Sequence, residues 1–154
     1  MGTNQSIQYT DKRFGIYHDL VINVSIVKVF AAVSEPEHLV NWWPFKCKGE
    51  PKAGSEYNFY FTPEYDWYGK VSECIPNRTF HVKMTRSDLD WDSTTFGFDM
   101  EEDKDGNTLL HFSHLNWPEC NSHYRIASFC WAMLLKGLKD YLEKGVILPF
   151  EKRS

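Results

Sequence analysis

Apolar and polar side chains alternate along much of the chain, which is the pattern of strands that bury one face. The first alternating segment is 14–22. Five further segments follow the same period: 55–61, 68–75, 79–86, 93–100 and 108–116. Turn signals such as Pro76-Asn77 and Asp105-Gly106-Asn107 separate the later segments, so the pattern predicts an antiparallel meander.

Between the first and second alternating segments the period changes to three and four. Apolar residues recur at this spacing over 26–33, and Ser25 is the expected N-cap. The next segment opens with the capping box Ser34-Glu35-Pro36-Glu37, which has proline in the first turn, and it continues through Trp42 and Trp43 until Pro44. Two short helices are therefore predicted after the first strand.

The last thirty residues carry the strongest helical signal. The run from Tyr124 to Lys144 is apolar around far more than the stripe of about 100° that a surface helix needs. We therefore expect a curved antiparallel sheet of six or seven strands to wrap this helix, which gives an α+β helix-grip fold. The expected organisation is a flexible segment at 1–13, one domain at 14–146 and a C-terminal tail at 147–154.

Short motifs occur in a recognisable order from Phe14 to Gly145. They are Val29-Phe30, Ser34-Glu35-Pro36-Glu37, Trp42-Trp43, Gly54 with Tyr57, Gly69-Lys70-Val71 with Glu73, Pro76-Asn77-Arg78, Trp91, Gly106 with Thr108, His114, and Gly137-Leu138-Lys139 running to Leu142-Glu143-Lys144-Gly145. With these motifs the chain resembles the START-like (SRPBCC) superfamily, and within it the homologues of the heat-shock ATPase activator, which share the fold of the major birch-pollen allergen. The resemblance implies the helix-grip fold. It also implies an additional N-terminal domain in the activator, which is absent here, so a chaperone partner is not expected.

Charge and hydropathy narrow the range of partners. The formal net charge is −4, and scattered Lys and Arg residues form no basic stripe that would neutralise a phosphate backbone, so nucleic acid is not expected to bind. No stretch approaches 18 apolar residues and the N-terminal segment is polar, which argues against a membrane span and a secretory signal. The cytoplasm is the expected location. Asp66-Trp67-Tyr68 would support a homodimer if exposed, although a half-buried strand end explains it equally well.

No strong metal or catalytic motif is present. His111 and His114 lie three apart on a predicted strand and face opposite sides, which argues against zinc. The acidic residues at 101–105 and at 88–92 are interpreted as solvated turns. Structural thiols are expected at the four cysteines, Cys47, Cys74, Cys120 and Cys130. We expect no metal, no cofactor and no catalytic residue.

Aromatic residues make up 16% of the chain, which suits the lining of a ligand pocket between the sheet and the long helix. The predicted ligand is a small hydrophobic or amphipathic molecule. The predicted pocket walls are Trp42, Trp43, Tyr57, Phe59, Phe61, Phe80, Phe96, Phe98, Phe112, Phe129 and Met133, with His114 as the polar contact.

Three alternatives stay open at this stage. The aromatic residues could instead form a filled core, and His114 could be a histidine satisfied by neighbouring groups. An enzyme acting in the same cavity is the second functional hypothesis. A chaperone partner that binds the surface is the third.

Overall fold

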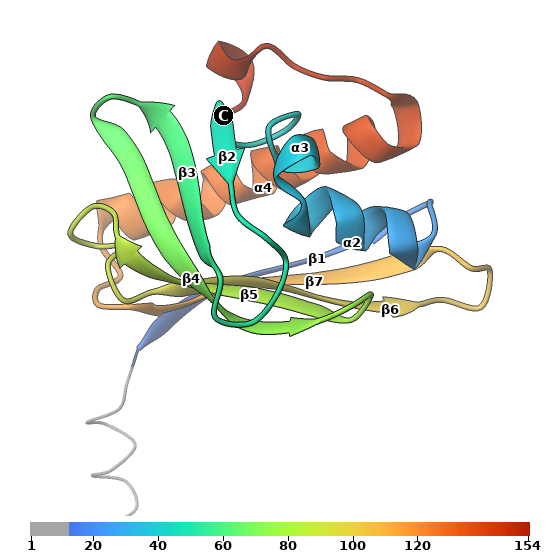
Figure 1. Cartoon of the computed structure of the whole chain (residues 1–154), viewed down its shortest axis with the longest axis horizontal. Helices are drawn as coiled ribbons and strands as arrows, with labels where there is room; N and C mark the ends of the chain where they lie inside the picture. Colours follow the sequence, from blue (N-terminus) through green and yellow to red (C-terminus); the bar gives the residue numbers. More distant parts are fainter. Residues whose placement is uncertain (1–12) are drawn as a thin grey trace, which may run out of the picture.

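The computed structural model describes residues 13–154, so the expected flexible segment 1–13 falls, apart from Arg13, outside the described residues. In chain order the elements are β1 (Phe14–Ile22), α2 (Ile26–Ser34), α3 (Pro36–Leu39), β2 (Lys46–Lys48), β3 (Glu56–Thr62), β4 (Tyr65–Ile75), β5 (Thr79–Arg86), β6 (Thr95–Glu102), β7 (Thr108–Trp117), α4 (Ser122–Lys144) and η1 (Phe150–Lys152). Figure 1 shows a curved sheet with α2, α3 and α4 on its concave side.

The strands form one antiparallel sheet in the order β1-β7-β6-β5-β4-β3-β2. Strands β2 to β7 pair with their neighbours in sequence, whereas β1 pairs with β7. Register shifts in the β3–β4 and β4–β5 pairs mark bulges, which bend a sheet, and Figure 1 shows β3 and β4 turned up toward the helices. The predicted α+β helix-grip fold is confirmed. The alternating pattern did not reveal β2, because it has only three residues.

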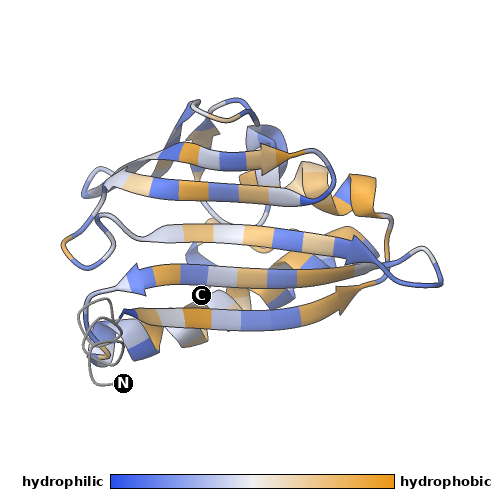
Figure 2. Cartoon of the chain, turned by 90° about the horizontal axis from the view of Figure 1, so that it is seen from below, coloured by the Kyte–Doolittle hydropathy of each residue, from blue (hydrophilic) through white to orange (hydrophobic). Residues whose placement is uncertain are grey.

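The concave face of the sheet is filled by an aromatic core. Phe98 on β6 lies opposite Phe80 on β5 and Phe112 on β7, and the Phe98 and Phe112 ring centroids are 5.4 Å apart. Helix α2 contributes Phe30, which meets Phe80 edge-on at 6.4 Å. Polar and apolar residues alternate along the strands in Figure 2, as the sequence pattern predicts.

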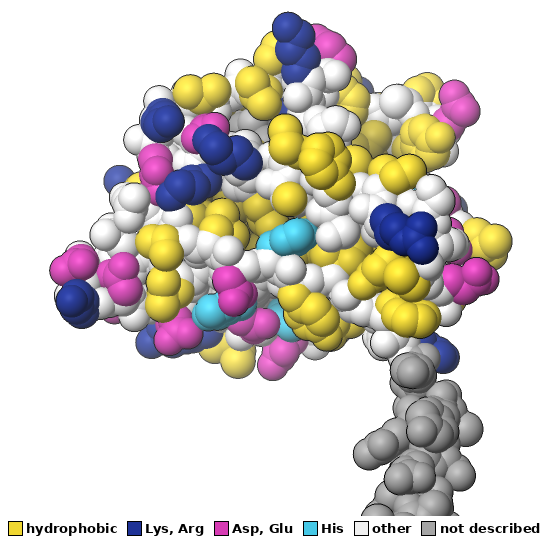
Figure 3. Space-filling model, turned by 180° about the vertical axis from the view of Figure 1, so that it is seen from behind, with side chains coloured by type: hydrophobic (Ala, Val, Ile, Leu, Met, Phe, Trp, Pro, Cys, Tyr) yellow, Lys and Arg dark blue, Asp and Glu magenta, His cyan; other side chains and the backbone are white. Residues whose placement is uncertain are grey.

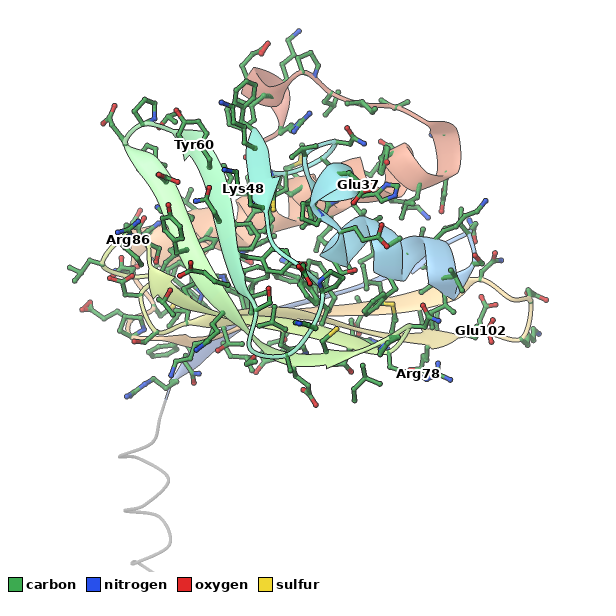
Figure 4. The ribbon with its side chains drawn as sticks, viewed as in Figure 1. Glu37, Lys48, Tyr60, Arg78, Arg86 and Glu102 are labelled. Atoms are coloured by element: carbon green, nitrogen blue, oxygen red, sulfur yellow. The ribbon has the colours of Figure 1, made fainter. Side chains whose placement is uncertain are left out.

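Charged side chains lie around this core. Figure 4 shows side chains filling the space between the sheet and the helices, while the labelled Arg78 and Glu102 lie near the edge of the molecule and Glu37 lies on α3. These three residues are exposed. The space between sheet and helix is therefore occupied by protein side chains.

The two short helices form where expected, but the boundary between them differs. Ser34 ends α2 instead of capping the next helix, because its hydroxyl donates to the Phe30 carbonyl at 2.6 Å. Helix α3 has only four residues, with Glu35 as N-cap. The predicted Ser34 capping box is therefore wrong, and Trp42 and Trp43 follow α3 in turns.

Helix α4 buries only one face. Its buried residues are Ala127, Trp131, Leu134, Leu135 and Leu138. On the outward side, Ile126, Phe129 and Met133 are 58%, 68% and 50% exposed. The curved sheet wraps the buried face of α4 as predicted, but the apolar residues on the outward side are not covered. Figure 3, which views the molecule from behind, shows hydrophobic side chains among charged ones on this side.

After α4 the chain turns back across the domain. Gly145 ends the helix in the left-handed conformation with φ 69°, which glycine adopts without steric cost. Phe150 then packs on Phe45 with centroids 5.4 Å apart, and the Arg153 guanidinium donates to the Val40 carbonyl at 2.7 Å. The segment expected as a tail therefore contacts the region after α3. Among the described residues, no helix combines the length and hydropathy that a bilayer crossing requires.

Candidate functional site

A cavity of about 660 Å³ lies beside the packed core. Its walls come from the turn after α3, the β3–β4 hairpin, the β5–β6 connection, the first half of α4 and the C-terminal segment. Figure 1 shows these segments gathered at one end of the domain. The lining residues are Trp43, Phe61, Thr62, Tyr65, Trp67, Asp88, Trp91, His123, Ala127, Cys130, Trp131, Leu134, Phe150 and Ser154. Most of this surface is apolar, as is usual for small-molecule sites.

Five aromatic side chains of the lining contact one another in a closed circuit. The ring centroids of Trp43 and Trp131 are 4.9 Å apart, those of Trp131 and Trp91 6.0 Å, and those of Trp91 and Trp67 4.7 Å. Phe61 completes the circuit at 5.2 Å from Trp67 and 5.8 Å from Trp43. These separations are typical of attractive aromatic pairs. We call these five residues the aromatic collar.

Local structure brings the collar together from four parts of the chain. Phe61 and Trp67 lie on the two strands of the β3–β4 hairpin, at the register shift near its tip. Trp91 is held in the β5–β6 connection, where its backbone N–H is 3.1 Å from the Asp88 carbonyl oxygen. Trp43 follows α3, and Trp131 is on the buried face of α4. The collar therefore depends on the whole fold.

Two polar side chains, Asp88 and His123, stand beside the collar. The Trp91 N–H donates to Asp88 Oδ1 at 3.2 Å, while Asp88 Oδ2 is 3.9 Å from His123 Nε2. The other nitrogen of His123, Nδ1, lies 2.9 Å from Asp90 Oδ2. Burial raises the pKa of Asp88, the nearby Asp90 and Asp92 carboxylates add to this, and His123 and the Trp91 N–H oppose it. Asp88 is therefore a partly desolvated carboxyl group in the cavity wall.

His114 lies behind the collar and does not line the cavity. It is fully buried, and the Trp131 indole Nε1–H donates to His114 Nδ1 at 3.1 Å. His114 Nε2 therefore carries the hydrogen and donates to Thr94 Oγ1 at 2.8 Å, and that hydroxyl donates to the Trp91 carbonyl at 2.6 Å. Burial lowers the pKa of His114 to about 3, so the imidazole is neutral. Its contacts match the alternative of a satisfied histidine, and they hold two collar residues.

The structure brings only part of the predicted pocket wall to the cavity. Trp43 and Phe61 line it. The core contains Trp42, Tyr57, Phe59, Phe80, Phe96, Phe98 and Phe112, all of them at most 2% exposed. Phe129 and Met133 lie on the outward side of α4, so the prediction that they face the interior is wrong. The seven core residues do not line the cavity because their aromatic rings fill the space between the sheet and the helix.

Several lining residues were not predicted. Trp67 was considered for self-association, but its ring lines the cavity. Asp88 was interpreted as part of a solvated turn, and that interpretation is wrong for this residue, because its carboxyl group is partly buried at the cavity. The sequence did carry a signal that this turn is partly buried: Trp91 stands among its acidic residues, and large aromatic rings seldom stand in solvated turns.

The cysteine and histidine side chains of the described residues do not cluster into a metal site. The four cysteines are free thiols, and burial raises the pKa of Cys47 to about 12. Within residues 13–154, no three His, Cys, Asp or Glu side chains gather as metal ligands would. His111 lies on the outer face between Asp19 at 2.8 Å and Glu101 at 3.0 Å, away from the cavity.

Comparison with known proteins places this architecture among relatives. A solution structure described as the Aha1 dimer from Colwellia psychrerythraea has a TM-score of 0.78 and 29% identity, covering 86% of this chain and 98% of that chain. A crystal structure from Mesorhizobium loti, at 17% identity and a TM-score of 0.76, covers 87% of this chain and all of its own. A crystal structure from Staphylococcus saprophyticus, also at 17% identity, has a TM-score of 0.72 and covers 88% of this chain and 96% of that chain.

Sequence comparison gives the family. No curated protein is a significant match to the chain. The family model described as activator of Hsp90 ATPase homolog 1-like protein matches residues 23–143, which is more than half of the chain. The protein therefore belongs to the family of activator of Hsp90 ATPase homolog 1-like proteins, within the START-like superfamily.

Proposed function

We propose that the protein binds a small, mostly apolar molecule in the cavity framed by the aromatic collar. The observation that carries this proposal is the closed circuit of five aromatic side chains around a space of about 660 Å³. Small-molecule sites have volumes of roughly 300–1,000 Å³ and apolar walls with a few polar groups, which is the composition found here.

The aromatic walls supply enough apolar surface for useful affinity. Burial of apolar area contributes about 25 cal/mol per Å², so a ligand that buries about 300 Å² gains roughly 7 kcal/mol before the cost of association is subtracted. The collar also enters the bound state already ordered, since its rings pack on one another and on the core. Little side-chain entropy is then lost on binding.

A fluorescence titration with the neutral apolar probe N-phenyl-1-naphthylamine tests the proposal. Ala127 lines the cavity, so Ala127→Leu should fill part of it and weaken binding at least tenfold. Ala132→Leu is the matched control, because Ala132 is exposed on the same helix and should leave binding unchanged. No saturable binding by the wild-type protein, or equal binding by both variants, would contradict the proposal.

We also propose that two copies of the chain associate through the outward stripe of α4, formed by Ile126, Phe129 and Met133. These large apolar side chains lie at i, i+3 and i+7, so they share one face of the helix, and each is at least half exposed. The similar protein from Colwellia psychrerythraea is described as a dimer. A second copy would cover the stripe with its own, as in an isologous twofold contact.

Sedimentation velocity tests this association. The wild-type protein should sediment with the mass of two chains, and Phe129→Glu with the mass of one. Tyr17→Glu serves as control, because Tyr17 is equally exposed but lies on β1, and it should remain dimeric. A monomeric wild-type protein at tens of micromolar, or a dimeric Phe129→Glu variant, would exclude the stripe as the interface.

A further inference from the structure

The charge of the cavity lining restricts the ligand's polar group. Among the described lining residues none is Lys or Arg, and the acidic and basic side chains are Asp88 and His123. Arg153, which lines a neighbouring hollow, is already engaged, because its guanidinium donates to the carbonyl oxygens of Val40 at 2.7 Å and Pro44 at 3.3 Å. A carboxylate or phosphate on the ligand would find only His123 as a basic partner, and its two ring nitrogens already face Asp90 at 2.9 Å and Asp88 at 3.9 Å.

Asp88 is incompletely satisfied within the protein. Its Oδ1 accepts one backbone hydrogen bond, from Trp91. Its Oδ2 lies 3.9 Å from His123 Nε2, which is too far for a hydrogen bond, and His123 has its shorter contact with Asp90. Since burial raises the pKa of Asp88, the carboxylate has lost part of its hydration. A cation next to Oδ2 would replace that lost stabilisation.

The aromatic collar favours the same charge. Indole rings carry negative potential on their faces and attract cations within about 6 Å of the ring centroid, with tryptophan the strongest of the aromatic residues. Four of the five collar residues are tryptophans, and Trp91 and Trp67 are nearest in the circuit to the Asp88 turn. The cavity thus combines several indoles with one carboxylate on its wall.

Building on the proposed function, we propose that the cavity binds an organic cation: a molecule with an ammonium or guanidinium group and an apolar body. The cationic group lies against Asp88 and the indoles of Trp67 and Trp91. The apolar body extends between Trp43, Phe61 and Trp131. Binding forms and breaks no covalent bond.

Two probes of the same shape test the charge preference. Phenyltrimethylammonium and tert-butylbenzene differ in one atom, a quaternary nitrogen in place of a carbon, so only the cation should respond to Asp88. We expect Asp88→Asn to weaken phenyltrimethylammonium binding about five- to tenfold and to leave tert-butylbenzene binding unchanged. Asparagine can still accept the Trp91 hydrogen bond, and circular dichroism checks that the variant folds. Asp105→Asn, at the exposed β6–β7 turn, is the control for net charge and should change neither affinity.

The outcomes separate the two proposals. Loss of affinity for the cation alone in Asp88→Asn supports the inference. Equal effects on both probes, no effect on either, or binding of tert-butylbenzene without phenyltrimethylammonium would overturn the cation preference and leave the apolar site standing. If neither these probes nor N-phenyl-1-naphthylamine binds the wild-type protein, both proposals fail together.

Discussion

His114 connects the aromatic core to the collar through directed hydrogen bonds. Trp131 donates to one ring nitrogen, and the other donates to Thr94, whose hydroxyl in turn bonds the Trp91 carbonyl. Because both nitrogens are used, the imidazole has one stable tautomer and no spare site for a proton. The residue therefore orients two collar tryptophans without touching the cavity itself.

This arrangement predicts a specific acid sensitivity. The pKa of His114 is lowered to about 3 by burial, whereas histidine in an unfolded chain titrates near ~6.5. Between these values the unfolded chain binds a proton that the folded protein does not, so stability decreases as the pH falls. The expected loss from this group is about 1.4 kcal/mol per pH unit.

Urea unfolding from pH 7 to pH 4.5 measures this slope. His114→Gln is the informative variant, because an amide can accept from Trp131 and donate to Thr94 without titrating. The wild-type protein should be more stable at pH 7, and the difference should shrink as the pH falls. Parallel stability curves for the two proteins would show that His114 does not carry the acid sensitivity.

The surface histidine, His111, makes stability depend on pH in the opposite direction. Hydrogen bonds to Asp19 and Glu101 raise the pKa of His111. Its contribution is therefore complete below the unfolded pKa near ~6.5 and disappears as the pH rises through the raised value. Since His111 and its partners are largely exposed, the contribution should stay below about 1 kcal/mol, measured as the difference between wild type and His111→Gln at pH 5 and pH 8.5. A difference that grows toward pH 8.5 would refute this assignment.

Strand parity predicted which residues point inward, but it could not predict their partners. The inward positions Phe96, Phe98, Phe112 and His114 are all buried as expected. Whether an inward ring lines a cavity depends on what fills the opposite wall, which is set by contacts between distant elements. Trp131 and Trp91 meet across 40 positions of sequence, and no local pattern reports that contact.

At the scale of elements, α4 shows why composition alone overestimates burial. Its apolar residues occupy most of the circumference in the sequence, yet the sheet contacts only one side of a helix that lies across it. Leu138 is fully buried, whereas Phe129 is 68% exposed. The outward side is therefore free for another partner, which the proposed second copy would supply.

Truncation of these two residues should have different consequences. Leu138→Ala leaves a cavity in the core and should lower the free energy of unfolding by about 3 kcal/mol. Phe129→Ala should change it by no more than about 0.5 kcal/mol in dilute protein, because its ring contacts mainly solvent there. Chemical unfolding of both variants gives the comparison, and a loss above about 2 kcal/mol for Phe129→Ala would show that the Phe129 ring is buried within the domain.

Across the whole molecule, the fold follows from the periodic spacing of apolar residues along the chain. The cavity depends instead on the segments where that periodic spacing ends. Alternation and turn residues define the meander, and the long apolar run defines α4. Apart from α4, the cavity walls come from the turn after α3, the β3–β4 hairpin, the β5–β6 connection and the returning C-terminal segment, and no periodicity describes how these segments meet. Trp43 and Phe61 were predicted as part of an aromatic pocket wall, and they line the cavity because they lie at the ends of regular elements.

The central claim is that a ligand enters the aromatic collar and not the core. The chain has six tryptophans, four in the collar and two, Trp42 and Trp117, in the core outside the cavity lining. The most direct measurement is the ¹H–¹⁵N spectrum of the indole groups during titration with N-phenyl-1-naphthylamine. The signals of Trp43, Trp67, Trp91 and Trp131 should shift most, whereas largest shifts at Trp42 and Trp117, or no saturable shift of any indole, would contradict the claim.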